Sequence, residues 1–344
     1  YLRKRYKVNN LKIIANGIYF PTKQVKNEEL ENKLNLEKGY IEKRTGIKNR
    51  YYAVEEKIED MALKATKNLF EKEKMNPKEK INQKETNENE TIKNDIAKEQ
   101  ETKDIGLIIT ATTSTDILMP GISNYIQKSL NLKPCICLDI LAGCSGYINS
   151  FDIAKMYIDS GNVKRALIVG VDRLSQVIDK EDIGTAVVLS DGAGATLIEK
   201  DEETNKQKLY ISNIQADGNN NDILTYKHGK KIYMNGKEVY KYAVTKTVQN
   251  VKELLDKANL KLEDIKYIVP HQSNLKIMKA IASRLHIEIE KMYTNIETRG
   301  NTFCASIPIA LYDMQEKGML NPGDKIILLG YGGGLNTGSI LLEI

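Results

Sequence analysis

Apolar positions along the chain alternate between the spacing of a helix and the continuous runs of buried strands. Apolar residues at helical spacing predict a helix over residues 58–69. Continuous apolar runs at 105–111 and 135–141 predict two buried strands, and a helical pattern over 144–160 ends at Gly161. Strands and helices that alternate in this way are typical of an α/β fold.

The alternation continues through the rest of the chain. Apolar runs predict strands at 166–171, 185–189 and 196–198, and the small residues 191–195 lead into the last of these. A further strand is predicted at 265–269. Both halves of the chain are therefore expected to contain strands separated by helices.

Three spacings recur in the same order in the two halves. Strands that open at Asp104 and Asp264 precede Cys144 and Asn301 by similar distances. Each of these two residues is followed, after the same number of positions, by a glycine and then by a basic-then-apolar run. A repeat of this kind indicates an internal duplication.

We therefore predict two duplicated βαβ halves, residues 1–200 and 201–344, that face each other. Equivalent loop ends of the two halves would then meet at one central site. Cys144, His271 and Asn301 all lie at such ends.

Residues 71–104 differ from the rest of the chain in composition. This run consists almost wholly of Lys, Glu, Asn, Gln and Thr. Such a segment buries too little apolar surface to offset the entropy that ordering would cost. We interpret it as a low-complexity surface insertion in the first half.

Composition narrows the classes of function. Four cysteines in 344 residues do not suggest a disulfide framework and favour a reducing compartment. With three histidines in the chain, and no second cysteine pair to join Cys135 and Cys137, no metal site is expected. No run approaches the ~18 apolar residues of a membrane-spanning helix, so no membrane insertion is expected.

The charge pattern bears on partners. The net charge is +5, lysine and glutamate are mixed along the chain, and tryptophan is absent. The lack of a basic stripe and of aromatic stacking platforms disfavours nucleic-acid binding. A mild positive excess fits acidic partners, such as phosphorylated cofactors or an acidic carrier protein.

Cys144 is the first candidate for chemistry. It lies in Leu141-Ala-Gly-Cys-Ser-Gly146, after a predicted strand and at the start of a predicted helix. Small neighbours permit a tight turn that exposes the thiol, and a helix N-terminus can lower a thiol pKa from ~8.5 to ~3.5–7.5. The thiolate would then attack a thioester carbonyl. A small buried cysteine on a helix is the structural alternative.

Three further features lie near predicted strand or helix ends. His271 follows Pro270, which ends the strand pattern and places the histidine in a loop rather than in the core. Asn301 precedes a helix, where an N-cap or turn role is the alternative to chemistry. The glycines 332–334 follow a strand and either form a plain turn or bring a backbone N–H close to an oxyanion.

Short motifs with these residues occur in a fixed order over nearly the whole chain outside residues 71–104. They are Arg44-Thr-Gly-Ile47, Ala111-Thr-Thr-Ser114, Ala142-Gly-Cys-Ser-Gly146, Asp191-Gly-Ala-Gly-Ala195, Met234-Asn-Gly-Lys-Glu-Val239, Val269-Pro-His-Gln-Ser-Asn274, Gly300-Asn-Thr302, Ala305-Ser-Ile-Pro308 and Gly332-Gly-Gly-Leu335 with Gly338-Ser339. The ordered set resembles the β-ketoacyl-[acyl-carrier-protein] synthase III family of thiolase-like condensing enzymes. The resemblance implies a thiolase-like α/β fold with a five-layered αβαβα core.

The resemblance also implies a role for each catalytic candidate. Cys144 takes the acyl group from an acyl-CoA primer, acetyl-CoA being expected, and the N–H groups of Cys144 and Gly333 hold the oxyanion. Malonyl-acyl-carrier-protein then enters, and His271 and Asn301 bond its thioester carbonyl oxygen while CO₂ leaves. The carbanion attacks the acyl-cysteine, which starts type II fatty-acid synthesis. No metal or redox cofactor is implied, and the CoA thioester is a substrate.

Residues that bind CoA are implied in the same way. Arg44 matches a position that contacts CoA, and Tyr40 stands where many members have a tryptophan that stacks on the adenine. Asn274 completes the histidine motif and is expected to line the substrate site. Position 176 is Gln, where some members have an arginine that sandwiches the base. Met119 matches a position that shapes the acyl pocket of the neighbouring subunit in a homodimer, with core packing as the alternative.

Four basic residues are expected to form a patch near the entrance, suited to an acidic carrier protein. They are Lys241, Lys276, Lys279 and Arg284. For Lys279 and Arg284 a solvated helix face is the alternative.

Other functions remain open at this stage. The Cys-His-Asn set does not separate fatty-acid initiation from a secondary-metabolite (polyketide or quinolone-type) condensing enzyme of the same fold. A hydroxymethylglutaryl-CoA synthase would need a further catalytic glutamate near the nucleophile, and no convincing one is found. A thiolase would have a second catalytic cysteine near the C-terminal glycines, but Cys304 follows Asn301, so packing accounts better for it. A non-catalytic thioester-binding scaffold would have lost at least one residue of the set, and all three are present.

The biased composition bears on location. The Lys/Asn-rich insertion resembles those of proteins from AT-rich genomes, including apicoplast-targeted fatty-acid enzymes. We therefore expect the plastid (apicoplast) stroma, with a bacterial cytoplasm as the alternative. The chain begins at Tyr1, and a trimmed leader is one explanation of that start.

Overall fold

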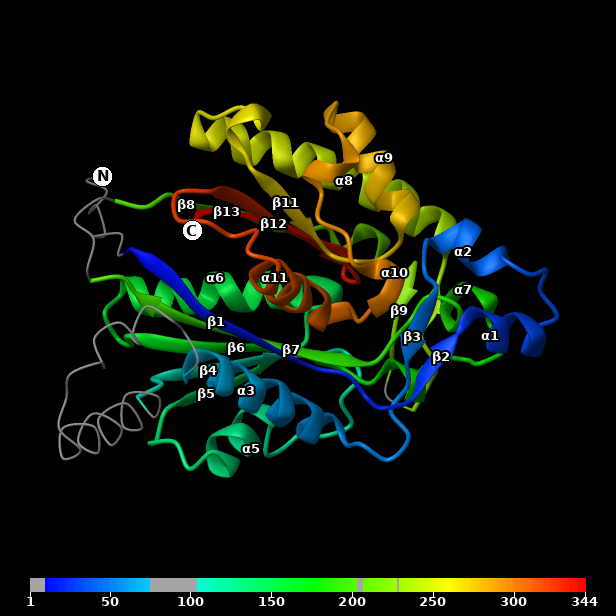
Figure 1. The fold of residues 1–344 in the computed structure, drawn as a ribbon, viewed down its shortest axis with the longest axis horizontal. Coiled ribbons are helices and arrows are strands. Elements are labelled where there is room, and N and C mark those ends of the chain that lie inside the picture. The colour runs from blue at the N-terminus through cyan, green and yellow to red at the C-terminus, as the bar shows by residue number, and fades with distance from the viewer. Residues whose placement is uncertain (1–9, 75–103, 203–206, 228) are drawn as a thin grey trace.

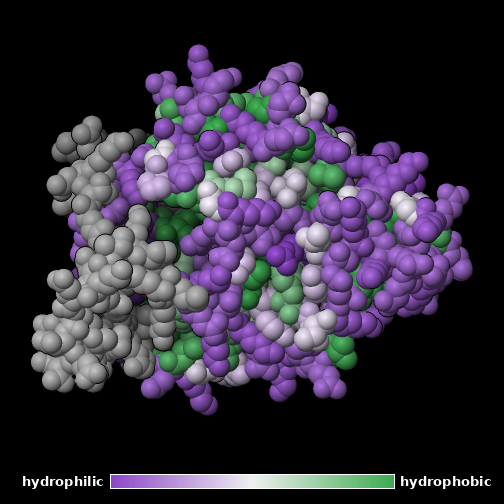
Figure 2. All heavy atoms as spheres, viewed as in Figure 1, coloured by the Kyte–Doolittle hydropathy of each residue, from purple (hydrophilic) through white to green (hydrophobic). Residues whose placement is uncertain are grey.

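Five layers of helices and sheets make up the protein, in the order αβαβα (Figure 1). The computed structural model describes residues 10–74, 104–202, 207–227 and 229–344. Two sheets face each other across a central layer of two helices, and further helices cover the outer face of each sheet. Hydrophilic residues cover most of the face drawn in Figure 2. The predicted fold class is confirmed.

The first sheet has the strand order β1-β7-β6-β4-β5. Its strands are β1 (Leu11–Tyr19), β4 (Leu107–Ala111), β5 (Ile136–Ile140), β6 (Arg165–Asp172) and β7 (Gly192–Lys200). β4 runs parallel to β5 and β6, while β7 is antiparallel to both β6 and β1. β4 is buried along its whole length, as expected for a strand in the middle of a sheet covered on both faces.

The second sheet has the order β11-β12-β13-β8. Its strands are β8 (Tyr210–Ala216), β11 (Tyr267–Pro270), β12 (Lys325–Gly332) and β13 (Asn336–Glu343). β11 and β12 are parallel, and β13 is antiparallel to both β12 and β8. A single parallel bridge from Ile268 to Met292 lies where the first sheet has β5.

The longer helices occupy three layers. α6 (Gly146–Asp159) and α11 (Ser306–Glu316) contact both sheets and form the central layer. α3 (Ile58–Lys74) and α5 (Ile122–Ser129) cover the first sheet, and α8 (Gly236–Ala258) and α9 (Leu275–Leu285) cover the second. Three clusters of buried apolar residues fill the spaces between these layers.

Shorter elements surround the central site. They are β2 (Gln24–Lys26), α1 (Asn27–Lys33), α2 (Tyr40–Thr45), β3 (Asn49–Tyr51), α7 (Ile183–Ala186), β9 (Leu224–Thr225), β10 (Tyr233–Met234) and α10 (Ile296–Arg299). β2 pairs with β3 and β9 pairs with β10. Figure 1 shows α1, α2, α7, β2 and β3 together at one end of the molecule.

The predicted duplication is present, but the equivalence of Cys144 and Asn301 is wrong. Two 3₁₀ turns, η2 (Gly143–Ser145) and η7 (Phe303–Ala305), lead into α6 and α11. Gly143 and Phe303 both have a positive φ, of 55° and 45°. Cys304 therefore stands in the place equivalent to Cys144. The equal spacing to the glycine misaligned the two halves because α6 has 14 residues and α11 has 11.

Three strand and helix predictions need correction. The run 185–189 was predicted as a strand, but α7 begins at Ile183 because the Asp182 carboxylate caps it, accepting the Gly184 N–H at 2.9 Å. The run 135–141 is a strand, yet β5 lies at the sheet edge and is only partly buried. The polar run 71–104 overlaps α3, which continues to Lys74, and residues 75–103 lie outside the described residues.

Candidate active site

Cys144 lies in the 3₁₀ turn η2, between the end of β5 and the start of α6. Gly143 begins this turn with a φ of 55°, and a Cβ there would lie 3.0 Å from the carbonyl oxygen of Gly333. The conformation and the close approach both favour glycine. The small neighbours of Cys144 had suggested a turn that exposes the thiol. Cys144 is only 3% exposed, so the turn instead directs the thiol into the interior.

The C-terminal glycines pack directly against the nucleophile. A Cβ on Gly332 would lie 2.7 Å from the Cys144 Cβ and 3.0 Å from its Sγ. The N–H groups of Gly333 and of Cys144 itself favour the thiolate and so oppose the rise in the pKa of Cys144 that burial causes. Both predicted oxyanion donors therefore lie beside the sulfur.

Replacing Gly332 with alanine is expected to displace the thiol and lower acylation of Cys144 by at least tenfold. The reason is the 2.7 Å contact, which is shorter than any ordinary carbon–carbon contact. Stoichiometric labelling by acetyl-CoA, followed by mass spectrometry, measures this. Gly218, whose Cβ position is open, provides the control as Gly218→Ala, which should acylate normally. Normal acylation of Gly332→Ala would contradict the packing account.

The net effect of the environment raises the pKa of the Cys144 thiol. Burial is the main cause, and the negative charge of Asp172 adds to it, while the two backbone N–H groups oppose it. The lowered pKa predicted from the helix N-terminus is therefore not found. The thiol is protonated at neutral pH, so its attack on a thioester requires a group that accepts the proton.

His271 follows β11, as predicted, but it is buried and not in an open loop. His271 is 1% exposed, and its backbone N–H donates to the Leu329 carbonyl at 2.7 Å. The ring packs edge-on against Tyr331 and Phe303, with centroids 5.4 and 6.5 Å away. Burial lowers the pKa of His271 to about 3, which keeps the imidazole neutral at physiological pH.

Ser306 fixes the orientation of the histidine. Its Oγ lies 2.7 Å from Nδ1 of His271, across the boundary between β11 and α11. Because the hydroxyl can donate or accept, it can hold Nδ1 in either neutral tautomer. Ser306 lies in the quoted Ala305-Ser-Ile-Pro308 motif, but nothing local in the sequence links it to His271.

Substituting Ser306 with alanine is expected to lower kcat for condensation about tenfold, with little change in KM, because one neutral hydrogen bond that orients His271 is lost. Ser306→Thr keeps the hydroxyl and should restore most of the rate. Steady-state kinetics of the two variants test this positioning role. Equal losses in both variants would indicate a packing role instead.

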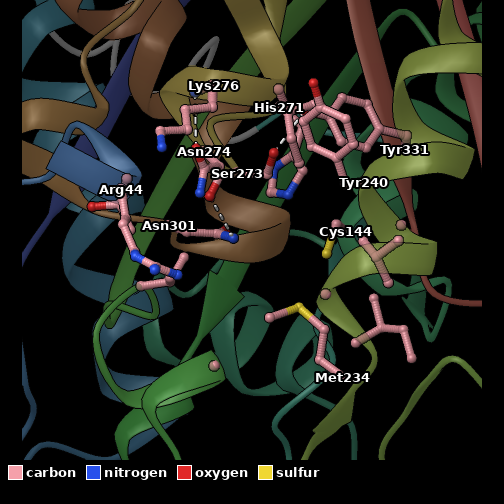
Figure 3. A pocket seen from close by; sticks show the side chains of 18 of the residues that line it. Arg44, Cys144, Met234, Tyr240, His271, Ser273, Asn274, Lys276, Asn301 and Tyr331 are labelled. Atoms are coloured by element: carbon pink, nitrogen blue, oxygen red, sulfur yellow. Dashed lines mark hydrogen bonds between the residues drawn. The ribbon is translucent and has the colours of Figure 1, made fainter. Parts of the chain in front are cut away.

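Asn301 is 5% exposed and lies at the end of the short helix α10. Its Oδ1 accepts the Phe303 N–H at 3.0 Å, and its Nδ2 lies 3.5 Å from the Ser273 carbonyl oxygen. The turn role considered for this residue is therefore real, yet it also fixes the amide so that the NH₂ group faces the site. Figure 3 shows Cys144, His271 and Asn301 converging on one cavity.

A buried network that the sequence did not predict supports this arrangement. The Asp172 carboxylate accepts the N–H groups of Thr113 at 2.7 Å, Ser114 at 3.0 Å and Cys304 at 3.0 Å. The Cys304 Sγ in turn donates to the Gly143 carbonyl at 3.0 Å. Burial raises the pKa of the Cys304 thiol, with the charge of Asp172 adding to the effect. Cys304 therefore links the two turns structurally.

Two cavities meet at Cys144. The first, of about 380 Å³, contains Cys144, His271 and Asn301 and extends to Tyr40 and Arg44. The second, of about 240 Å³, lies on the other side of the thiol. It is lined by Thr113, Leu141, Ala142, Gly143, Cys144, Leu224, Thr225, Tyr226, Ile232, Phe303, Gly333, Gly334 and Asn336. Cys144, Leu224 and Phe303 line both cavities.

The predicted CoA-binding residues lie along the first cavity. Arg44 stacks over the ring of Tyr40 at 4.6 Å from its centroid, so one face of that ring is occupied. Asn274 also lines the cavity and caps α9 by accepting the Lys276 N–H at 2.8 Å. Gln176 does not line this cavity but a different one.

The remaining predicted residues lie on the surface. Lys241, Lys276, Lys279 and Arg284 are all exposed on α8 and α9, and Lys276 also lines the first cavity. Met119 is 89% exposed, which excludes core packing within this chain.

The described residues contain no group of three or more His, Cys, Asp or Glu side chains arranged to bind a metal ion. No helix among them is long and apolar enough to cross a membrane.

Two duplicated halves, with a cysteine in the turn before the central helix of one half and a histidine and an asparagine from the other, define a thiolase-like condensing enzyme. Family models agree: 3-oxoacyl-[acyl-carrier-protein] synthase III matches residues 138–218, and the C-terminal model of the same family matches 255–344. The chain belongs to the β-ketoacyl-(3-oxoacyl-)[acyl-carrier-protein] synthase III family and is an acyltransferase of the condensing type.

Relatives cover nearly the full chain. The β-ketoacyl-[acyl-carrier-protein] synthase III of Clostridium acetobutylicum is 35% identical over 98% of this chain and 99% of its own. The crystal structure of the synthase III from Aquifex aeolicus has a TM-score of 0.86 at 34% identity, covering 97% of this chain and all of that one. The Thermus thermophilus synthase III has a TM-score of 0.84 at 31% identity, covering 96% and 98%.

Proposed function

We propose that the protein condenses an acyl-CoA primer, with acetyl-CoA expected, with malonyl-acyl-carrier-protein and so initiates type II fatty-acid synthesis. The observation that carries this proposal is the convergence of Cys144, His271 and Asn301 on one cavity. The names of the relatives favour fatty-acid initiation over a secondary-metabolite pathway.

In the first step, the Cys144 sulfur attacks the thioester carbonyl of the primer. The N–H groups of Cys144 and Gly333 stabilise the oxyanion as it forms. The carbon–sulfur bond to CoA then breaks, and the proton of Cys144 passes to the departing CoA thiolate, with neutral His271 as the carrier. Burial keeps His271 unprotonated at neutral pH, so one ring nitrogen is free to carry this proton transiently.

In the second step, His271 and Asn301 donate hydrogen bonds to the thioester carbonyl oxygen of the malonyl group. Negative charge grows on this oxygen as the carboxylate leaves as CO₂, and fixed donors stabilise it most in the transition state. The carbanion attacks the acyl carbon, the bond to Cys144 breaks, and the thiolate takes up one proton. A neutral imidazole with Nε2–H is the donor that this step requires.

The two cavities suit two parts of the substrate. The 380 Å³ cavity reaches the cationic residues Arg44 and Lys276, which suit the phosphates of CoA and the phosphopantetheine arm. The 240 Å³ cavity beyond the thiol suits a short acyl group. No metal or redox cofactor has a role in these steps.

The carrier protein is expected to dock on the exposed face of α8 and α9. Lys241, Lys276, Lys279 and Arg284 are the candidate contacts for its acidic surface. Arg284 of α9 lies against α8, with its Nη1 donating to Thr245 Oγ1 at 3.5 Å, so the two helices are adjacent at this residue.

A homodimer is part of the proposal. β5 lies at the edge of the first sheet, and apolar residues near it are exposed: Leu118 by 83%, Met119 by 89%, Ile136 by 36% and Leu141 by 70%. An unpaired edge strand with exposed apolar neighbours is suited to pairing with a second copy. Met119 would then reach the acyl pocket of the partner.

Light scattering should therefore give the mass of two chains for the wild type. The double variant Leu118→Glu and Ile136→Glu places charges at the proposed contact and should give a monomer. Met156→Glu changes an apolar residue on α6 that is 56% exposed, and it should leave the dimer intact. A monomeric wild type would contradict the proposed dimer.

A bacterial cytoplasm is the location we propose. The relatives described above are bacterial, and the plastid prediction finds no support among them.

The function is tested by incubating the protein with acetyl-CoA and malonyl-carrier-protein and measuring acetoacetyl-carrier-protein. Product and CO₂ are expected in equal amounts. Product with a panel of longer or branched acyl-CoAs, but not with acetyl-CoA, would overturn the proposed primer. No product with any primer would overturn the function.

A further inference from the structure

A separate cationic cavity of about 580 Å³ lies below the end of β3. Its lining is Lys23, Tyr52, Ala53, Val54, Arg173, Ser175, Gln176, Lys180 and Lys231. None of these residues lines either cavity at Cys144. Four of them are cationic and none is a carboxylate, so the cavity has an excess of positive charge.

Neutral groups hold these cations in place. The Arg173 Nη2 donates to the Val54 carbonyl at 3.1 Å, and the Gln176 amide oxygen, in its favourable orientation, accepts from Nη1 and Nη2 at 2.6 and 2.9 Å. The Lys231 Nζ donates to the Gln176 carbonyl at 2.9 Å. Among the described residues, neither these two cations nor Lys23 and Lys180 form an ion pair. Their charge therefore remains available to a ligand.

One carboxylate lies behind the cavity wall. Asp191 is fully buried and accepts the N–H groups of Ser175 at 2.8 Å and Ala53 at 2.7 Å, together with the Ser175 hydroxyl. Burial raises the pKa of Asp191 to about 6, although Arg173 and these donors oppose the rise. Asp191 is thus fully engaged by its own donors, and one such group does not balance four cations.

We propose that this cavity binds a compact phosphoanion with two or more phosphate groups. The guanidinium of Arg173 and three lysines supply positive charge and charge-assisted donors for phosphate oxygens. Cations that converge in a hollow attract a multiply charged anion more strongly than a singly charged one. A free polyphosphate and the phosphates of a second CoA molecule share this chemistry. The inference goes beyond the proposed function, and binding alone tests it.

Calorimetric titration of the full chain with inorganic triphosphate at neutral pH measures the site. We expect binding by the wild type and a loss of affinity of about tenfold or more in the double variant Lys180→Gln and Lys231→Gln, since two charge-assisted contacts are removed. Lys67→Gln with Lys252→Gln removes the same charge from exposed positions on α3 and α8 and should bind normally. Lys276→Gln, which alters the first cavity, should also bind normally.

Two results would overturn the site: no binding of triphosphate by the wild type, or binding that survives in the Lys180/Lys231 variant. Loss of binding in Lys276→Gln instead would move the anion to the first cavity and would also overturn the proposal. Titration with CoA distinguishes the two sources. If the wild type binds CoA at a second site and the Lys180/Lys231 variant does not, the cavity binds the phosphates of CoA. If the wild type has a single CoA site that this variant keeps, the cavity binds a free phosphoanion.

Discussion

Cys144→Ala is expected to abolish both acyl transfer and condensation, with product formation falling by at least three orders of magnitude. The sulfur of Cys144 lies between the two cavities at the backbone N–H groups of Cys144 and Gly333, and without it no covalent acyl-enzyme forms. Transfer of radiolabelled acetyl groups to the protein and formation of acetoacetyl-carrier-protein measure the two steps.

The control for this variant is Cys135→Ser. Cys135 lies next to β5, is half-buried and lines neither active-site cavity, so its replacement should preserve both steps. Acetyl transfer that persists in Cys144→Ala, or that disappears equally in Cys135→Ser, would contradict the assignment of the nucleophile.

His271→Ala and Asn301→Ala should each lower the rate of decarboxylative condensation by about 10²–10³, the usual loss for one oxyanion donor. Acylation of the protein by acetyl-CoA should fall much less in Asn301→Ala, because this amide acts on the malonyl carbonyl. His286→Asn is the matched control. His286 is exposed at the end of α9 in the left-handed region, which asparagine tolerates, so this variant should keep full activity.

The pH dependence provides a further check on His271. Burial lowers its pKa to about 3, so the imidazole stays neutral as the pH falls from 8 to 5. Protonation of His271 should therefore cause no loss of decarboxylation in this range. A loss with a midpoint near 6.5 in the wild type, absent from His271→Ala, would show that the histidine titrates normally and would contradict its buried, neutral state.

Local pattern predicted much of the fold. The helix over residues 58–69 and the strand at 166–171 have strong periodic signals, and both are present as α3 and β6. The strand predicted at 185–189 does not form. Its apolar residues are buried in the short helix α7 and in the turn that follows, and burial alone does not distinguish a strand from such a turn. Its cap at Asp182 was the available signal for a helix.

The sequence allowed the candidate residues of the site to be predicted, but not the surroundings of these residues. Ordered motifs identified Cys144, His271 and Asn301, whose side chains line one cavity. The burial of Cys144 and His271 could not be read from local sequence, because residues far away in the chain pack against them. Gly332 at the end of β12 packs against Cys144, and Phe303 of η7 packs against His271. The same reason explains why Asp172 was missed: its partners Thr113 and Cys304 come from two other segments.

The thiol pKa illustrates the limit most clearly. Position at a helix N-terminus is visible in sequence and predicts a lowered value. Burial and the charge of Asp172, which follow only from the tertiary structure, reverse the net direction. The consequence is mechanistic, since a protonated thiol needs a proton acceptor, and neutral His271 is placed in the same cavity.

The most direct test of the central claim is the mass of the protein after incubation with acetyl-CoA alone and then with malonyl-carrier-protein. The account predicts one added acetyl group, located on the peptide that contains Cys144, which disappears as acetoacetyl-carrier-protein forms. An acetyl group on another residue, or one on Cys144 that malonyl-carrier-protein does not remove, would contradict it.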